Sequence, residues 1–385
     1  MEIKNVTLPD MTREDDKNEH KNLIKILLSV LILFGIIGNS LNIKVFSEKK
    51  MRLGSTFRFL LYLSIADLSV LLICSTEALA RFGYSIEIRQ TSSLICKLHN
   101  FMTYFLTHFS SLILMAVSID RALVITNKTL NVCKKSFNKK KKPIVIVDNT
   151  QNYKLKCSCY LLDKLHHVDL VISFIILVLI VLNFHFFLFM ELNEETKLDE
   201  EFLRKKFNLT FQMNEILSRK INSLLEGIEP ELICFPLKKT TYHYFLIKIW
   251  TWIDMCVYSL IPFIVMFICS FIILFRIHIK SKTYFKRLIN KNSRLNKTNV
   301  SKRLRRNRQM LYMLLLTNFY FLLSQLPYCI LFIINKGKYS DSTLEQPLVH
   351  ILLYSNNAIN CILYGLSSQK YRQQLFGKYL KNDNE

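Results

Sequence analysis

Asp67 is the only acidic residue in the apolar stretch Phe59–Thr76. An ionisable side chain in such surroundings is costly unless it has partners, which makes it a candidate functional site. Other apolar stretches supply amide and hydroxyl side chains that could reach it: Asn39, Ser110, Asn356, Asn357 and Asn360. Oxygen ligands of these types suit a hard cation. They suit a hydrogen-bonded network without an ion equally well, and the sequence leaves both interpretations open.

The residues of this set lie in blocks of apolar sequence. Five blocks contain no Asp, Glu, Lys or Arg: Ile26–Ile43, Leu98–Ile119, Leu170–Met190, Met255–Phe275 and Met310–Asn335. Two more are Phe59–Thr76, interrupted only by Asp67, and Pro347–Ser368. Because a helix rises about 1.5 Å per residue, roughly 20 residues cross the hydrocarbon core of a bilayer. The pattern predicts an all-α integral membrane protein, a seven-transmembrane helix bundle. It excludes a barrel, whose strands would alternate polar and apolar over about ten residues.

The chain of 385 residues is 51% hydrophobic yet carries a formal net charge of +23. Lys and Arg crowd three segments, which follow the first, third and fifth spans: Lys44–Arg58, Lys128–Lys164 and Arg276–Arg308. The segment after the fourth span opens with acidic residues. Since positive residues mark the cytoplasmic side, we expect a plasma-membrane protein with its N-terminus outside and its C-terminus in the cytoplasm. This topology explains the basic excess without a nucleic-acid partner.

The same topology divides the chain into an extracellular tail (1–22), a membrane domain (23–365) and a cytoplasmic end (366–385). The expected spans are about 23–46, 57–79, 97–125, 168–190, 249–276, 309–335 and 346–365. A long cytoplasmic loop (127–167) and a long extracellular loop (191–245) separate some of them. After the last span, Tyr371, Leu375 and Phe376 begin a pattern typical of a short amphipathic helix at the membrane interface. Two sequons, Asn5 and Asn208, are expected outside the cell as glycosylation sites.

Short motifs along the spans, in the same order, resemble those of the rhodopsin-like (class A) G-protein-coupled receptors. The matching segments are Gly38-Asn39, Leu63–Asp67, Asp120-Arg121, Pro262, Phe321, Leu326-Pro327-Tyr328 and Asn360–Tyr364. Cys96 precedes the third span by the family's interval, and Cys234 lies in the second outer loop. The large, charged second outer loop and the Leu326–Tyr328 motif resemble peptide receptors, particularly invertebrate neuropeptide receptors. This subfamily resemblance is analogy, and it does not name a peptide.

The resemblance implies a role for each motif. Cys96 and Cys234 would form a disulfide that ties the second outer loop to the third span. Arg121 would pair with Asp120 at rest and be freed to meet a heterotrimeric G protein as the sixth span swings outward. The residues implied in this switch are Asp120, Arg121, Pro262, Phe321, Gln325, Pro327, Asn360 and Tyr364. The residues implied in the family's sodium pocket are Asp67, Ser110, Asn356, Asn357 and Asn360. No other cofactor is expected.

Several positions depart from the family's pattern. The residues that replace the expected ones are Ala122 (Tyr), Gln325 (Trp), Cys361 (Pro), Ser270 (Tyr) and Asn307 (Glu in some members). These changes weaken the implied resting lock. They favour either high basal activity or a divergent coupling geometry.

The outer pocket is expected to bind an extracellular ligand. Thr103 stands where amine receptors have an Asp, and Tyr354 stands where light receptors have a Lys, which excludes both classes. The residues expected to line the pocket are Glu77, His99, Thr103, Tyr104, Asp254, Gln325, Tyr328 and Phe332. Its two acids, Glu77 and Asp254, favour a cationic group such as the Arg or Lys of a peptide. Alternatively, Glu77 pairs with Arg81 one turn on, and Asp254 lies at the water interface.

Other functions fit the sequence less well. A receptor of the same fold with a non-peptide ligand, or a constitutively active orphan receptor, is an alternative within the family. A transporter or channel is a more remote alternative, because transporters commonly contain inverted repeats and this chain has none that we detect. An enzyme is not expected, since the spans contain no His-Glu-x-x-His motif and no second deep carboxylate beside Asp67. Membrane lipid is an expected partner, and the cluster Lys134–Lys142 could bind it, although a solvated basic loop explains the cluster equally well.

Overall fold

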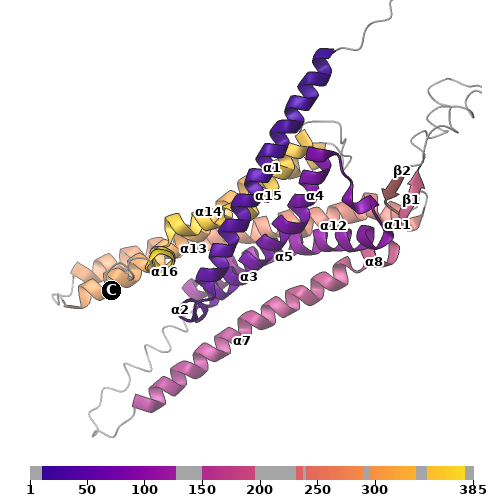
Figure 1. Ribbon diagram of the computed structural model, residues 1–385. Helices are drawn as coiled ribbons and strands as arrows, with labels where there is room; N and C mark the ends of the chain where they lie inside the picture. The colour runs from indigo at the N-terminus through magenta and orange to yellow at the C-terminus, as the bar shows by residue number, and fades with distance from the viewer. Residues whose placement is uncertain are drawn as a thin grey trace, which may run out of the picture.

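The computed structural model describes residues 11–126, 150–195, 231–236, 240–289, 295–334 and 345–377, and these are nearly all helical (Figure 1). Four segments are long single helices: α1 (Met11–Phe46), α5 (Ser93–Thr126), α14 (Leu295–Ile334) and α15 (Glu345–Ser367). A fifth consists of α7 (Thr150–Asn183) followed by α8 (His185–Phe189). Two more combine α-helix with π-helical turns. The first consists of α3 (Ser55–Val70), η1 (Leu71–Ser75), α4 (Thr76–Ala78) and η2 (Leu79–Gly83). The second consists of α11 (Thr241–Phe245), η4 (Leu246–Trp250), α12 (Thr251–Met255), η5 (Cys256–Leu260) and α13 (Ile261–Ile289). The short helices are α2 (Lys49–Arg52), η3 (Ile88–Gln90) and α16 (Gln369–Phe376).

Six of the described helical segments are long and apolar enough to cross a membrane: Glu19–Phe46, Ser55–Gly83, Ser93–Thr126, His167–Phe189, Thr241–Arg276 and Leu314–Leu331. The seventh, α15, has 23 residues, or about 35 Å of helix, and contains several asparagines that lower its hydropathy. The predicted seven-helix membrane bundle is therefore confirmed. The exact residues at which each span enters the bilayer stay a prediction.

The helices lie side by side around α5 (Figure 1). α5 packs against α3, α7 and α13, while α1 packs against α3 and α15, and α15 against α14. α7 lies at the edge of the bundle and presents an apolar stripe outward, with Leu170 68%, Phe174 66%, Leu177 60% and Val181 71% exposed. Such a large apolar surface would be unfavourable in water, and it is what a lipid-facing helix requires.

Small residues bring α1 close to α15. A Cβ atom added to Gly35 would lie 2.9 Å from the Cβ of Ala358, and one added to Gly38 would lie 3.0 Å from the Cβ of Cys361. Small residues at such positions allow close helix approach, which is how helices associate in a bilayer. The approach positions Asn39 against α15.

The second outer loop contains two paired strands that the sequence analysis did not predict. β1 (Leu192–Glu195) pairs antiparallel with β2 (Glu231–Cys234), and Leu192 lies opposite Cys234. The disulfide between Cys96 and Cys234 is formed, with an S–S distance of 2.02 Å, and it joins β2 to α5. The segments 127–149 and 196–230 lie outside the described residues, as do Asn5, Asn208 and Lys134–Lys142.

The amphipathic helix predicted after the last span is α16, but one residue of its predicted membrane face points elsewhere. Tyr371 is fully buried, and its hydroxyl donates to Asn42 Oδ1 of α1 at 2.7 Å. Arg372 donates to the carbonyls of Gly365 and Leu366, both at 2.8 Å, which completes the end of α15. α16 is therefore attached to the bundle by polar contacts, which its apolar periodicity alone did not reveal.

Candidate functional site

The ends of α5 define two ends of the bundle. The end that carries the Cys96–Cys234 disulfide is called the disulfide end, and the end that carries Arg121 is called the Arg121 end. Between Cys96 and Arg121 the helix rises for 25 residues, or about 37 Å, which exceeds the thickness of a bilayer core. The candidate sites lie at these two ends and in the polar core between them.

Asp67 lies at the centre of the polar core, fully buried on α3. Its Oδ1 accepts hydrogen bonds from Ser110 Oγ at 2.6 Å and Asn357 Nδ2 at 2.8 Å, and its Oδ2 accepts one from Asn360 Nδ2 at 2.7 Å. Three helices, α3, α5 and α15, therefore meet at one carboxylate. The amide and hydroxyl donors compensate for the loss of water around it.

Two other asparagines of the predicted set are buried nearby but do not contact Asp67 among the described residues. Asn39 Nδ2 donates to the carbonyls of Gly35 (3.0 Å) and Asn357 (2.8 Å), and its Oδ1 has no hydrogen-bond partner. Asn356 is 8% exposed and forms no hydrogen bond with the carboxylate within the ranges that the structure describes. The predicted set is thus partly assembled around Asp67.

The Asp67 cluster has a donor set that suits a sodium ion. The carboxylate, the Ser110 hydroxyl and the side-chain oxygens of Asn357 and Asn360 are hard oxygen ligands, and an amide can present its oxygen by rotating about its last bond. The partnerless Asn39 Oδ1 on the adjoining helix is a further buried oxygen. Among the described residues no cluster of three or more His, Cys, Asp or Glu is present.

Asp120 and Arg121 form an ion pair at the Arg121 end. Arg121 Nη2 lies 2.9 Å from Asp120 Oδ2, and only 13% of its side chain is exposed. The Asp120 carboxylate also accepts hydrogen bonds from Ser55 Oγ at 3.1 Å and Thr56 Oγ1 at 3.4 Å, both at the start of α3. Asp120 therefore bonds to α3 as well as to Arg121, and the ion pair is attached to the start of α3.

The other predicted switch residues lie on three helices. Phe321 and Tyr364 are fully buried, and the Tyr364 ring packs edge-on against Phe46 with centroids 5.5 Å apart. Pro327 lies inside α14, and Pro262 lies at the second residue of α13, directly after the π-helical turn η5. A proline removes one backbone donor, and a π-helical turn disturbs the regular ladder, so both places are weak points of their helices.

A second polar cluster, which the sequence analysis missed, lies nearer the Arg121 end. Asn318 of α14 accepts a hydrogen bond from Ser118 Oγ at 3.1 Å and donates one to Ser270 Oγ at 3.0 Å. It therefore joins α14 to α5 and α13. Ser270 occupies the position where the family has a tyrosine, and this departure was the only signal in the sequence that the region differs.

At the disulfide end, Glu77 pairs with a residue that sequence reasoning did not single out. Arg89 of η3 lies 3.2 Å from Glu77 Oε2, and the Glu77 side chain is 6% exposed. Arg89 also donates to Asn100 Oδ1 at 3.3 Å. Arg81, the partner weighed from sequence, pairs instead with Glu87 at 3.2 Å. The helical spacing from Glu77 to Arg81 was a poor guide, because the chain turns after η2 and carries Arg89 back over the bundle.

Asp254 is also engaged within the chain. Its Oδ1 lies 2.8 Å from Nε2 of His108, whose side chain is fully buried, and its Oδ2 accepts a 3.5 Å hydrogen bond from the Tyr328 hydroxyl. Asp254 is 13% exposed, so its carboxylate is largely enclosed by these partners. Tyr258 packs against both His108 (6.4 Å) and Tyr328 (6.5 Å), so the group forms a compact polar and aromatic floor.

The remaining pocket candidates are distributed differently from the prediction. Thr103 hydrogen-bonds to its helix neighbour His99, and Tyr104 stacks on Phe186 at 4.6 Å. Gln325 is 1% exposed and lies beside Tyr258, yet neither atom of its amide has hydrogen-bond geometry with a partner. The side chain of Phe332 lies outside the described residues. The structure thus yields two acid-centred groups, at Glu77 and Asp254, rather than one continuous ring of side chains.

Comparisons with known proteins agree with this architecture. The family described as 7 transmembrane receptor (rhodopsin family) matches residues 38–150. The chain is similar to galanin receptor type 2 of Homo sapiens, with 32% identity over 103 residues, which are 27% of this chain and 26% of the receptor. It is 32% identical over 103 residues to galanin receptor type 2 of Mus musculus (27% of each chain) and 33% identical over 104 residues to galanin receptor 2b of Danio rerio (27% of each chain). The chain spans about a quarter of the length of the curated relatives it matches.

The helical bundle, the family match over residues 38–150 and these relatives together make the chain similar to the rhodopsin-like (class A) seven-transmembrane receptors. The family is one of receptors rather than enzymes, and its members cross the membrane several times. The finer resemblance to invertebrate neuropeptide receptors stays a prediction.

Proposed function

We propose that this chain binds a peptide at its disulfide end and, in response, activates a heterotrimeric G protein at its Arg121 end. The N-terminus then lies outside the cell and the C-terminus in the cytoplasm. The relatives support the peptide ligand, because they are named galanin receptors and galanin is a peptide. The basic segments that follow the first, third and fifth spans support the orientation.

The observation that carries the proposal is the ion pair of Asp120 and Arg121 with its attachment to α3. A nearly buried arginine beside an acid at the end of a membrane bundle is costly to maintain for structure alone. Ser55 and Thr56 bond to the acid, and Arg121 Nη2 donates to Ser55 Oγ at 3.4 Å, so movement of α5 relative to α3 would break the contacts that hold the pair in place. The proposed switch residues are Asp120, Arg121, Pro262, Phe321, Gln325, Pro327, Asn360 and Tyr364.

The pocket geometry changes how a basic ligand would bind. Glu77 has the guanidinium of Arg89 beside it, and Asp254 has the imidazole of His108. A cationic ligand group must therefore displace or join an internal partner rather than meet a bare acid. Arg89 comes from a short loop, so displacing it requires less rearrangement than moving His108 within α5.

Two buried groups beside Asp254 favour an amide-rich ligand. Gln325 and His108 Nδ1 have no hydrogen-bond partner among the described residues, and an unpaired buried polar group costs about 1–3 kcal/mol. A peptide backbone offers a donor and an acceptor at every residue. The backbone of a peptide that reaches Gln325 could pair with both the nitrogen and the oxygen of its side-chain amide. Gln325 belongs to α14, the helix that contains Pro327.

The sixth span is proposed to move outward about Pro327 on activation. Asn318 lies between Pro327 and the Arg121 end, and it holds α14 to Ser118 and Ser270. Outward movement would break both hydrogen bonds. We further propose that a sodium ion binds at Asp67 with Ser110, Asn357 and Asn360, and that it holds α3, α5 and α15 together in the resting state.

The proposal is tested by Arg121→Ala in cells that express the chain together with a panel of G proteins. Agonists are sought in a peptide library, and nucleotide exchange is the readout. Loss of agonist-driven exchange with unchanged surface expression is expected. Lys44→Ala, which removes an exposed charge from the last turn of α1, is the matched control and should signal normally. Full signalling by Arg121→Ala would overturn the proposed role.

A further inference from the structure

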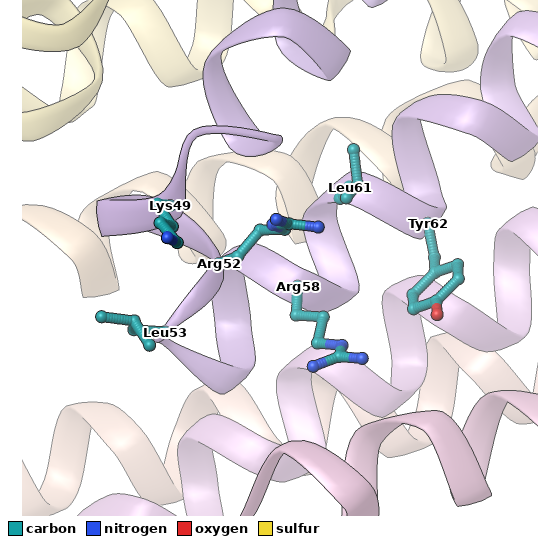
Figure 2. Close-up of a pocket in the computed structure, with 6 residues that line it drawn as sticks. All are labelled: Lys49, Arg52, Leu53, Arg58, Leu61 and Tyr62. Atoms are coloured by element: carbon teal, nitrogen blue, oxygen red, sulfur yellow. The ribbon is translucent and has the colours of Figure 1, made fainter. Parts of the chain in front are cut away.

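The described part of the chain has a half-open cavity at the Arg121 end, on the side of α3 that faces α7. Figure 2 shows the six residues that line it, which come from α2, the turn after it and the first two turns of α3: Lys49, Arg52, Leu53, Arg58, Leu61 and Tyr62. Its volume is about 250 Å³. A water molecule occupies about 30 Å³ in the liquid, so the cavity can hold a polar group much larger than a single ion or water.

The cationic side chains of this cavity are not equally compensated. Arg58 pairs with Asp169 of α7, and the Tyr62 hydroxyl donates to the other oxygen of the same carboxylate at 3.0 Å. Lys49 and Arg52 are exposed, and the structure shows no acidic partner for either within the ranges that it describes. Three cations and one adjoining acid leave an excess of two positive charges.

The cavity also has an apolar side. Leu53 is 51% exposed, and Leu61 is half-buried on the outer surface of α3. The cavity lies beside the first residues of α3, of which Ser55 and Thr56 contact Asp120. It is therefore at the same end of the bundle as Arg121, and its lining combines cationic and apolar side chains.

We propose that the cavity is a binding site for an anionic phospholipid. The lipid phosphate lies between Lys49 and Arg52, and the apolar part of the lipid contacts Leu53, in the turn before α3, and Leu61 on α3. A basic cavity beside membrane helices selects an anionic headgroup by charge. A zwitterionic lipid would bring a positive group toward the same cations, and a sterol would leave them without a partner. A soluble anion would make no use of the exposed leucines.

The lipid would also stabilise the contact between α3 and α7. Arg58 and Tyr62 both reach Asp169 from α3, and they form the wall of the cavity that faces α7. A phosphate near Arg52 lies beside this ion pair without replacing it. The cavity is distinct from the Asp120–Arg121 ion pair, so occupancy need not interfere with a partner at the Arg121 end.

The test measures lipid binding to the purified full-length chain by native mass spectrometry. Phosphatidylserine, phosphatidylinositol 4-phosphate and phosphatidylcholine are titrated in detergent. The affected variant is the double substitution Lys49→Gln and Arg52→Gln. The control is Lys44→Gln with Arg276→Gln, which removes the same charge from exposed positions at the ends of α1 and the fifth span.

The wild-type chain should prefer the two anionic lipids over phosphatidylcholine. Each basic side chain near a membrane surface contributes roughly fivefold to the affinity for anionic lipid, so the affected variant should lose about 30-fold and the control less than about threefold. Leu53→Asn should weaken the binding of the lipids and leave the binding of soluble inositol 1-phosphate unchanged. All five substituted side chains are exposed, and thermal unfolding of each variant verifies that the fold is kept.

Three results would overturn the proposal. Equal losses in the affected variant and the control would mean that only overall charge attracts the lipid. Equal binding of phosphatidylcholine would remove the anionic selection. Binding of inositol 1-phosphate as tight as that of the lipids would assign the site to a soluble anion. The measurement uses no agonist and no G protein, and in detergent the two sides of a membrane are not distinguished. Its outcome is therefore independent of the proposed receptor function and orientation.

Discussion

The pairing of Glu77 with Arg89 predicts a strong energetic coupling between two residues that lie on different segments. Arg89 Nη2 lies 3.2 Å from Glu77 Oε2, and the two side chains are 25% and 6% exposed. Burial lowers the pKa of Arg89, but the neighbouring Glu77 carboxylate raises it, and the net pKa lies above its ordinary value. The guanidinium therefore stays charged at any pH used for an assay. The perturbation is a double-mutant cycle of Glu77→Gln, Arg89→Gln and both together.

The expected magnitude follows from the distance and the burial. Two unit charges 3.2 Å apart attract by about 5 kcal/mol at an effective dielectric constant of about 20, and desolvation offsets much of this. Glu77→Gln should cost about 2 kcal/mol, because Arg89 is a quarter exposed and can regain water. Arg89→Gln should cost about 3 kcal/mol, because it leaves a nearly buried carboxylate unpaired. The double variant should cost about 3 kcal/mol, which gives a coupling of about 2 kcal/mol.

The assay is thermal unfolding of the purified, ligand-free chain in one detergent. At roughly 2 °C per kcal/mol, the single variants should lower Tm by about 4 and 6 °C, and the double variant by about 6 °C rather than 10 °C. A second readout tests the pocket itself. If Arg89 competes with the cationic group of a ligand, Arg89→Gln should raise the affinity for a basic peptide relative to a neutral analogue, and Glu77→Gln should lower it.

The exposed pair of Arg81 and Glu87 provides the control. Its atoms are also 3.2 Å apart, but the side chains are 32% and 34% exposed, so Glu87→Gln should cost less than about 1 kcal/mol. Strictly additive effects of Glu77→Gln and Arg89→Gln would refute the reasoning. So would a cost for Glu87→Gln as large as that for Glu77→Gln, because burial would then not determine the strength of the pair.

Three further predictions concern other parts of the bundle. Cys96→Ser and Cys234→Ser should weaken ligand binding to the same extent, and radioligand saturation should show little added loss in the double variant, since either change opens the same bond. Gly35→Ala should destabilise the fold by about 1–3 kcal/mol in thermal unfolding, because the new methyl group would lie 2.9 Å from a Cβ atom of α15; Gly365→Ala, with nothing within 4 Å, should be nearly neutral. Gln325→Leu should raise Tm by removing a buried amide without partners, and it should lower agonist affinity in competition binding; a fall in both would contradict the proposed pocket.

Much of the polar core could be predicted because a bilayer restricts the choices. An acid in an apolar helix must find partners within the bundle, and the candidates were few, so Ser110, Asn357 and Asn360 could be named from sequence. The seven spans followed from the length of the apolar blocks in the same way. Asn356 forms no hydrogen bond with Asp67 among the described residues, because adjacent residues of a helix point in directions about 100° apart and the sequence does not fix its rotation; its place in the predicted set stays a prediction.

The partners of the two pocket acids could not be predicted, and the reason is physical. Arg89 lies 12 residues from Glu77 across a turn, and His108 lies 146 residues from Asp254. No helical period links either pair, so only the packing of the segments brings them together. The strands β1 and β2 were missed for a related reason. Four-residue segments such as Glu231–Cys234 are too short for a periodic signal, and here the disulfide at Cys234 holds the strand in place.

The helix α5 contributes a member to five buried polar groups of the bundle. On α5, Asn100 contacts Arg89, His108 contacts Asp254, and Ser110 contacts Asp67. Further along the helix, Ser118 contacts Asn318 and Asp120 contacts Arg121. These residues of α5 cover about 30 Å of helix, from the disulfide end to the Arg121 end. An unpaired buried polar group costs about 1–3 kcal/mol, so α5 cannot slide or rotate gradually; each group must exchange one set of partners for another. The bundle should therefore have discrete states, and a ligand that replaces one partner of α5 at the disulfide end would bias the equilibrium of the other groups, including the pair that holds Arg121.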